Sequence, residues 1–285
     1  MKKPMTFEQQ LDILLNRGLI IENTNECLEI LRSINYYRLS AYLLPFKLKN
    51  NSYKDGTSLV KIKKIYEFDC KLRLLILSAI EEIELYLRTQ FAYHFAHTYG
   101  TLGYLNPNNF SCRHNHEKFV NSISAVIKSN RSSPVVKHHI KEYEGKFPVW
   151  VIVEFFSIGN LSYFYADWAV ADKKKLAKLL YETTYPFLDS WLKCLTVLRN
   201  RCAHYSRLYY ANFTDMPRVS STVNYKCTRR AFDQLMVLKF LHPHNDKWNK
   251  VFCAPLASLV SEYRTSINLE HIGFPKDWMD ILSNT

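Results

Sequence analysis

The stretch that decides the fold is LRLLILSAIEEIELYLRTQF, residues 72–91. Its large apolar side chains recur at steps of three or four residues, at Leu72, Ile76, Ile80, Ile83, Leu87 and Phe91. This spacing predicts one buried stripe along an α-helix. Neither Pro nor Gly interrupts the chain from Ser58 to Tyr99, and Gly100 ends the pattern. Because a straight helix of that length would span about 60 Å, we expect a kink or break near Asp69.

The segments on either side also show helical periodicity. Helices are expected over residues 6–17, 24–34, 115–130, 135–144, 228–241, 255–265 and 275–283, and as a pair around Gly159 in 148–168, while the aromatic-rich stretch 34–46 is stopped by Pro45. Thr6 and Gln9 have the spacing of a capping box. The run VWVIVEFF (149–156) could pass locally for a buried strand, but no partner strand is found elsewhere. The sequence therefore predicts an all-α protein.

Composition narrows the classes of partner. Among 285 residues there are only 7 Gly and no low-complexity linker, which favours one elaborated domain over two loosely joined ones. The formal charge of +12 favours a polyanion, and nucleic acid, an acidic membrane surface and an acidic protein are all compatible with it. Seven scattered cysteines without a CxxC pair suit reduced thiols, and no leader or membrane span is recognisable. We therefore expect a cytoplasmic protein.

The strongest chemical signal is LRNRCAHYSRL, residues 198–208. Pro186 suits the first turn of a helix whose apolar stripe is Leu188, Trp191, Leu195, Leu198 and Cys202. Asn200 and His204 are four residues apart and share a face away from that stripe, with Arg199 near its edge. An imidazole can accept the proton of a ribose 2′-hydroxyl, and a guanidinium can stabilise charge on a phosphorane. Alternatively, Arg199 pairs with Glu81 or Glu84, and His204 is an ordinary cation at a helix C-terminus.

The segment LRNRCAHYSRLYY (198–210) resembles the RN-x3-H signature of HEPN-domain ribonucleases, specifically the Abi-like (AbiD and AbiF) abortive-infection family. The resemblance continues in order over much of the chain. It includes LDILLNRGLII (11–21), INYYRLSAYLLPF (34–46), IYEFDCKLRLLILSAIEEIELYLRT (65–89), PVWVIVEFFSIGNLSYFY (148–165) and, more weakly, GFPKDW (273–278). The chain departs from the family at Tyr209 and Tyr210, where Trp-Asn or Tyr-Asn is common, and at SIGNLS (157–162), where segments like SFGTLS are found.

The resemblance implies a HEPN-type antiparallel helical bundle with N-terminal and C-terminal helical extensions. Residues 1–55 would pack on a core of 56–213, and 214–285 would extend it. The resemblance also implies a homodimer with one signature from each protomer in a shared cleft. Arg199, Asn200 and His204 would then cut RNA without a metal or other cofactor, leaving a 2′,3′-cyclic phosphate and a 5′-hydroxyl. The biology implied is a toxin-like response to phage, with a small noncoding RNA as a partner in AbiF-type members.

Other residues are candidates for supporting roles. Glu84 and Arg88 have the spacing of an intrahelical ion pair, and Glu81 or Glu84 could instead orient Arg199. Basic runs could line an RNA groove, with aromatic side chains stacking on unpaired bases. The residues considered for this groove are KIKK (61–64), KKK (173–175), Lys226, Arg229 and Arg230, with Tyr205, Arg207, Tyr209 and Tyr210 beside the signature. The histidines of CRHNH (112–116) and HPH (242–244) have no second ligand pair at zinc spacing, so no metal is expected.

Three functions follow from the sequence as alternatives. The first is a metal-independent endoribonuclease of a phage-defence system, with His204 as general base, Arg199 as phosphate clamp and Asn200 as positioning residue. The second is a non-catalytic RNA-binding protein that holds a small structured noncoding RNA. The third is a regulator that docks another protein through its aromatic N-terminal segment. RNA affinity with a strong salt dependence but no cleavage would distinguish the second from the first.

Overall fold

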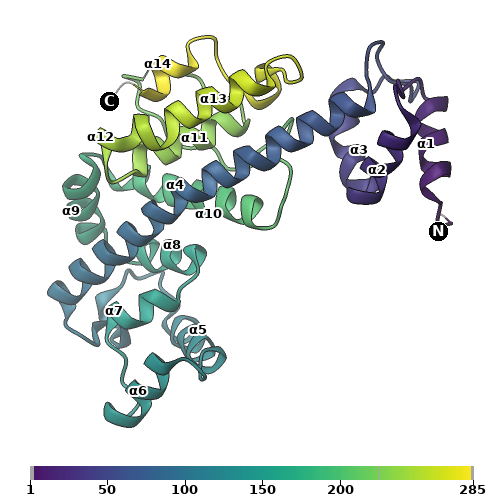
Figure 1. Cartoon of the computed structure of the whole chain (residues 1–285). Coiled ribbons are helices and arrows are strands. Elements are labelled where there is room, and N and C mark those ends of the chain that lie inside the picture. Colours follow the sequence, from purple (N-terminus) through teal and green to yellow (C-terminus); the bar gives the residue numbers. More distant parts are fainter. Residues whose placement is uncertain (1–2, 224, 284–285) are drawn as a thin grey trace.

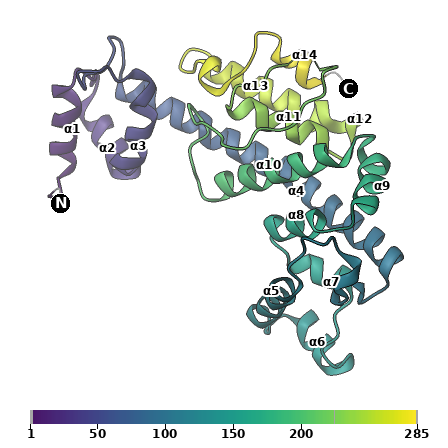
Figure 2. The same cartoon turned by 180° about the vertical axis from the view of Figure 1, so that it is seen from behind.

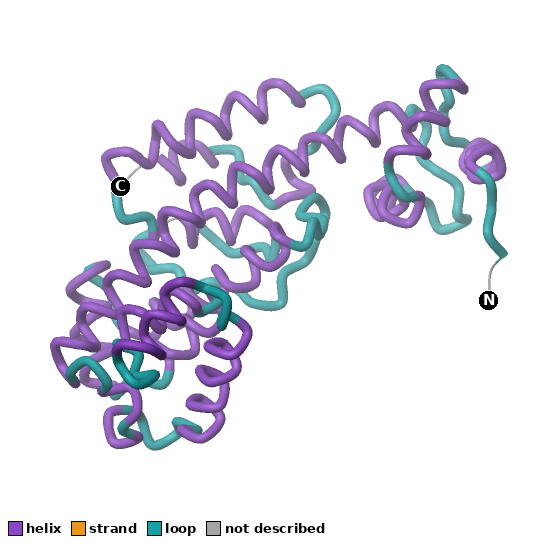
Figure 3. The backbone as a smooth tube through the Cα atoms, turned by 60° about the horizontal axis from the view of Figure 1, so that its bottom comes forward, coloured by secondary structure: helices purple, strands orange, loops and turns teal. Residues whose placement is uncertain are grey.

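The computed structural model describes residues 3–223 and 225–283, and it is all-α, as the sequence predicts. Figure 1 shows one very long helix, α4, with the other helices arranged along it. Figure 3 shows that loops alone join the helices, and the described part of the chain contains no strand. The helices are α1 (Phe7–Asn16), α2 (Thr24–Ser33), α3 (Tyr36–Leu43), α4 (Leu59–Tyr99), α5 (His116–Ser129), α6 (Pro134–Glu142), α7 (Val149–Ile152), α8 (Ile158–Ala166), α9 (Val170–Tyr181), α10 (Tyr185–Ala203), α11 (Ala231–Leu241), α12 (Asn245–Trp248), α13 (Ala254–Tyr263) and α14 (Trp278–Ser283).

Helix α4 is the element on which the rest is assembled. Ser58 caps its first turn by accepting a hydrogen bond from the Lys61 amide, and Gly100 ends it with φ of 81°. All six apolar positions of the predicted stripe are buried. The expected break near Asp69 is wrong, because the helix is continuous from Leu59 to Tyr99. Asp69 lies on the buried side of the helix and is compensated there by hydrogen bonds from other elements.

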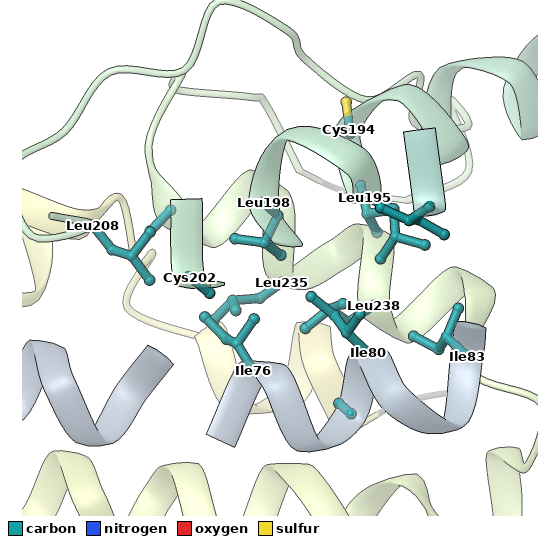
Figure 4. Packing of buried hydrophobic residues seen from close by; sticks show 14 of the residues in the cluster. Ile76, Ile80, Ile83, Cys194, Leu195, Leu198, Cys202, Leu208, Leu235 and Leu238 are labelled. Atoms are coloured by element: carbon teal, nitrogen blue, oxygen red, sulfur yellow. The ribbon is translucent and has the colours of Figure 1, made fainter. Parts of the chain in front are cut away.

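Helices α10, α11 and α13 pack along α4 and form the core with it. Just before α10 begins, the ring of Tyr181 contacts the ring of Tyr86 in the second half of α4. Just after α10 ends, the amides of Leu208 and Tyr209 donate to Asp69 in the first half of α4. Helix α10 therefore runs antiparallel to α4. Figure 4 shows Ile76 and Ile80 of α4 facing α10 and α11 across a layer of buried apolar side chains.

Helix α11 is buried nearly all round, which is expected of a helix enclosed by others. The stacked rings of Trp191 and Phe240 place its last turn beside the beginning of α10. Figure 1 shows that α13 also runs antiparallel to α4, and an ion pair at 2.6 Å joins Lys71 of α4 to Glu262 at the end of α13. Core packing is thus continuous beyond residue 213, while the domain boundaries at 55 and 213 remain predictions.

Two groups of helices lie at the two ends of α4. Figures 1 and 2 show α1–α3 at its N-terminal end and α5–α7 at its C-terminal end. The sequence placed a break between two helices at Gly159, and this is wrong, because Gly159 lies in the first turn of α8. The break falls before Ser157, which caps α8 by accepting from the Asn160 amide. None of the helices in 3–223 and 225–283 is both long and apolar enough to span a membrane.

Two neighbouring positions on α4 test the importance of its buried stripe. Ile76 is completely buried, whereas the side of α4 that carries Leu74 faces solvent, and Leu74 is 68% exposed. Replacing Ile76 with Ala should lower the free energy of unfolding by about 2–5 kcal/mol through lost burial and the cavity left behind. Leu74→Ala, the control, should change it by less than about 0.5 kcal/mol. Urea denaturation measures both, and equal effects would contradict the assigned faces of the helix.

Candidate active site

The residues of the Arg-Asn-His signature lie at the C-terminal end of α10. Pro186 occupies the first turn, and all five positions of the predicted apolar stripe are buried, so this helix is confirmed. Asn200 and His204 are exposed, and Arg199 is half-buried. His204 is the C-cap residue, and its amide donates to the Asn200 carbonyl at 3.0 Å. In the described part of the chain, the three side chains form no hydrogen bond or ion pair with other protein groups, so they are free to meet a ligand.

A Schellman motif fixes the chain directly after His204. The Tyr205 amide donates to the Cys202 carbonyl at 3.1 Å, and the Ser206 amide donates to the Arg201 carbonyl at 2.8 Å. Tyr205 itself has φ of 57°, a left-handed backbone conformation that Gly usually adopts. Arg38 of α3 holds this strained residue by donating to its carbonyl at 2.6 Å. The backbone next to His204 is therefore fixed by the hydrogen bonds of the Schellman motif and by Arg38. The Tyr205 ring itself remains 68% exposed.

Asp69 anchors the segment that follows. Its fully buried carboxylate accepts from the Tyr209 amide at 2.8 Å and from the Leu208 amide at 3.2 Å. It also accepts from the Tyr42 hydroxyl at 2.7 Å and pairs with Arg73, one turn further along α4. Sequence reasoning missed this role. The sequence did contain an indication of it. Asp69 falls in register with the apolar stripe of α4 and Arg73 follows four residues later, a pattern that indicates a buried ion pair.

Arg207 is also part of this framework. Its guanidinium donates to the Ala41 carbonyl of α3, and burial lowers its pKa. Cys202, within the signature, is 1% exposed, and burial raises the pKa of its thiol to about 12. It therefore stays a neutral thiol near pH 7 and is unsuited to act as a nucleophile. Any chemistry of the signature thus falls to the exposed side chains.

The predicted support residues on α4 have structural contacts. Glu84 pairs with Arg88, as the spacing indicated. Arg88 also donates to the carbonyls of Val153 and Phe156, and so holds the turn before α8. Glu81 is exposed, and no ion pair joins either glutamate to Arg199 within 3–223 and 225–283. A role for these glutamates in orienting Arg199 remains a hypothesis without a direct contact.

Two predicted members of an RNA groove are buried instead. Tyr209 is completely buried, and its hydroxyl contacts Nδ1 of His271 at 2.8 Å, so it cannot stack on a base. Lys173 is 6% exposed and pairs with Asp189 at 2.7 Å. Periodicity alone did not reveal this burial, because residues of other elements cover both side chains, His271 near Tyr209 and Asp189 near Lys173.

The other groove candidates are spread over the molecule. The Arg230 guanidinium lies over the half-buried ring of Tyr210, and Lys61 lies near the ring of Phe46. Lys63 pairs with Glu67 on the surface of α4. Lys64, Lys174, Lys226 and Arg229 are exposed, and Lys175 lies in the α9 surface near His94. Only Tyr205 among the predicted stacking residues is both exposed and next to the signature.

The histidine clusters have local partners. His114 pairs with Asp167 at 2.8 Å and contacts His116 at 3.2 Å, and His116 contacts the Leu105 carbonyl. His242 lies 3.4 Å from Glu82 of α4. Across the described residues, no group of three or more His, Cys, Asp or Glu side chains is arranged to hold a metal ion.

Fold and site together define an all-α protein that exposes an Arg-Asn-His cluster at the end of a core helix. The family model described as Abi-like protein matches residues 29–210, well over half of the chain. The chain therefore belongs to the Abi-like family, a membership that associates it with abortive infection, a defence against phage. The match begins in α2 and ends just after the signature, at Tyr210. Comparison with curated proteins and with solved structures finds no match.

Replacing Asp69 tests how strongly the segment after α10 is anchored. Asp69→Ala leaves Arg73 buried without its partner and removes the acceptor of two backbone amides. The free energy of unfolding should fall by about 3–5 kcal/mol. Glu67→Ala, on the same helix, breaks an exposed pair of the same four-residue spacing and should cost less than about 1 kcal/mol. Urea denaturation gives both values, and a small cost for Asp69→Ala would refute the anchoring role.

The contact between Tyr209 and His271 makes a pH-dependent contribution to stability. The Tyr209 hydroxyl accepts from the Asn268 amide, and its own proton is donated to Nδ1 of His271 when that nitrogen is unprotonated. Burial, assisted by the charges of Lys54 and Arg230, lowers the pKa of His271.

Because the unfolded chain has the higher histidine pKa, it binds more protons as the pH falls below about 6.5. The contribution of His271 is therefore complete above that pH and is lost progressively below it. Urea unfolding at pH 7.5 and pH 5.5 should show a smaller loss of stability for His271→Gln than for the unmodified chain. The control is His138→Gln at an exposed position, which should retain the full loss. An unchanged loss in His271→Gln would exclude this contribution.

Proposed function

We propose that the chain is a HEPN-type, metal-independent endoribonuclease that acts in abortive infection. The observation that carries the proposal is the exposed pair Asn200 and His204 beside Arg199, with side chains unpaired within the described chain and a backbone fixed by the Schellman motif. A site prepared in this way costs little reorganisation when substrate binds. The +12 charge suits a polyanionic substrate, and membership of the Abi-like family supplies the defence context.

The proposed mechanism assigns one task to each side chain. His204 accepts the proton of the ribose 2′-hydroxyl as its oxygen attacks the adjacent phosphorus. Arg199 stabilises the negative charge that develops on the phosphorane oxygens, and Asn200 orients the reacting groups by hydrogen bonding. The bond from phosphorus to the 5′-oxygen then breaks, which leaves a 2′,3′-cyclic phosphate and a 5′-hydroxyl.

The leaving 5′-oxygen must gain a proton, so the reaction needs a general acid as well as a general base. The Arg-Asn-His cluster of one chain contains one histidine. We therefore propose a homodimer, in which the His204 of a second copy supplies the acid in a shared cleft. The position of His204 at the exposed end of α10 leaves room for such an approach. A cytoplasmic location and a small noncoding RNA regulator complete the proposal.

A non-catalytic RNA-binding protein is the second candidate. The same +12 charge favours it, because cationic side chains bind RNA phosphates whether or not a cut follows. In that case, the exposed Tyr205 and the signature would hold a structured RNA.

The test is cleavage of end-labelled RNA in EDTA by the full chain and by variants. His204→Ala should lower the cleavage rate by at least about 100-fold, as expected for loss of general-base catalysis. The control, His138→Ala, removes another exposed histidine, on α6, and should keep the rate. Products of the unmodified chain should end in a cyclic phosphate, detected by its resistance to phosphatase. RNA that is bound but stays intact, with equal affinity for all three proteins, would favour the RNA-binding protein instead.

A further inference from the structure

A cleft between α5 and α8 has the features of a second binding site. Its volume is about 450 Å³, within the range of small-ligand sites. Helix α5 contributes Lys118 and Phe119, and α8 contributes Asn160 and Tyr163. We call it the α5–α8 cleft. None of these residues belongs to the Arg-Asn-His signature.

The positive charge of the cleft is available to a ligand. Arg113 and Lys118 line it, both are exposed, and neither forms an ion pair with another residue of the described chain. The one acid in the lining, Asp167, is paired with His114 at 2.8 Å. The two unpaired cations outnumber the single carboxylate of the lining, and this excess of positive charge favours an anionic group such as a phosphate.

The walls of the cleft are aromatic and suit a planar ring. The Tyr163 side chain is 74% exposed, an unusual position for a large ring on a helix that packs against the core. Phe119 is held from behind by a stacked contact with Phe164 at a centroid distance of 5.9 Å. The amide of Asn160 adds both a donor and an acceptor to the lining. An aromatic wall, an amide and two cations match a nucleobase with its phosphate.

Packing of α8 connects the cleft to the candidate active site. A Cβ added at Gly159 would lie 3.6 Å from the Thr196 side chain, so α8 begins beside that residue of α10. Thr196, Asn200 and His204 follow each other at four-residue steps along one face of α10. Asn200 is thus one turn, about 6 Å along the axis, beyond the point where α8 meets α10. Asn160 and Tyr163 thus lie on the helix that begins beside the helix carrying the signature.

We propose that the α5–α8 cleft binds a nucleotide of single-stranded RNA whose neighbouring segment lies at the Arg-Asn-His cluster. Tyr163 and Phe119 contact the base, and Arg113 and Lys118 contact phosphate. The proposal rests on the proposed ribonuclease function and adds a substrate-binding subsite to it. It also gives a physical basis for a preference for unpaired RNA, because a base can enter the cleft only when it is free of a duplex.

The experiment measures binding in the full-length His204→Ala chain, so that RNA stays intact. Fluorescence anisotropy with labelled single-stranded RNA should show roughly tenfold weaker binding after Tyr163→Ala, as for loss of one stacked base. Tyr93→Ala, at a ring 55% exposed on α4, is the control and should bind normally.

The charge of the cleft is tested separately. Replacing Arg113 and Lys118 together with Ala should weaken binding and reduce the slope of log affinity against log salt by about 1.4, the value for two phosphate contacts on a single strand. Lys128→Ala combined with Lys137→Ala removes the same charge from exposed positions outside the cleft and should leave the slope unchanged. Circular dichroism confirms that each variant is folded.

Competitors identify what the cleft holds. Adenosine monophosphate should displace RNA from the cleft at lower concentration than inorganic phosphate does. RNA affinity that is equal in cleft variants and controls would overturn the proposal. Cleft variants that no longer bind free adenosine monophosphate but bind RNA normally would overturn it as well.

The proposed subsite and the proposed ribonuclease activity can be contradicted independently of each other. Unaffected RNA binding in the cleft variants, with normal cutting when the same cleft substitutions are made in the chain that keeps His204, removes the subsite and leaves the ribonuclease. Weakened binding in the cleft variants without any cutting by the unmodified chain removes the ribonuclease and leaves the cleft.

Discussion

The buried carboxylate of Asp69 is the interaction on which the candidate site depends. It accepts hydrogen bonds from Tyr42 of α3 and from the amides of Leu208 and Tyr209, and it pairs with Arg73. A buried charge of this kind is tolerated only when its partners are all in place. The same group therefore joins three parts of the chain that are distant in sequence. It fixes where the chain goes after α10 and thus where the signature lies relative to α4.

The N-terminal helix α3 contributes to the site although it lies outside the core bundle. Arg38 holds the carbonyl of Tyr205, and Arg207 reaches back to the Ala41 carbonyl. These contacts stabilise a left-handed residue directly after His204, a conformation that costs free energy and persists only when its surroundings enforce it. The polar network thus provides a rigid support, while the signature side chains themselves stay exposed. Rigid support beneath free functional groups is what a preorganised site requires.

Charge and aromatic rings are distributed in keeping with a single-stranded RNA ligand. One lysine of the basic runs is used internally, in the buried pair of Lys173 with Asp189, and the others are spread over the surface. What remains available includes Arg199 at the signature and the cations of the α5–α8 cleft. Exposed rings accompany both places, Tyr205 at the first and Tyr163 at the second. Helix α8, which begins beside Thr196 of α10, is the structural connection between them.

The sequence by itself determined the all-α class, the buried stripe of α4, the helix that carries the signature and the Abi-like resemblance. These follow from local periodicity, capping residues and motif spacing, which need no knowledge of distant contacts. It failed at Asp69, where the length of the helix suggested a break, and at Gly159, where the break lies just before Ser157. Only the tertiary structure decided that Asp69 is an anchor, that Tyr209 is buried and that α5 and α8 enclose a cleft. The reason is physical: burial and pairing of polar groups depend on residues far away in the sequence, such as Leu208 and Tyr209 for Asp69 and His271 for Tyr209, and no local pattern records them.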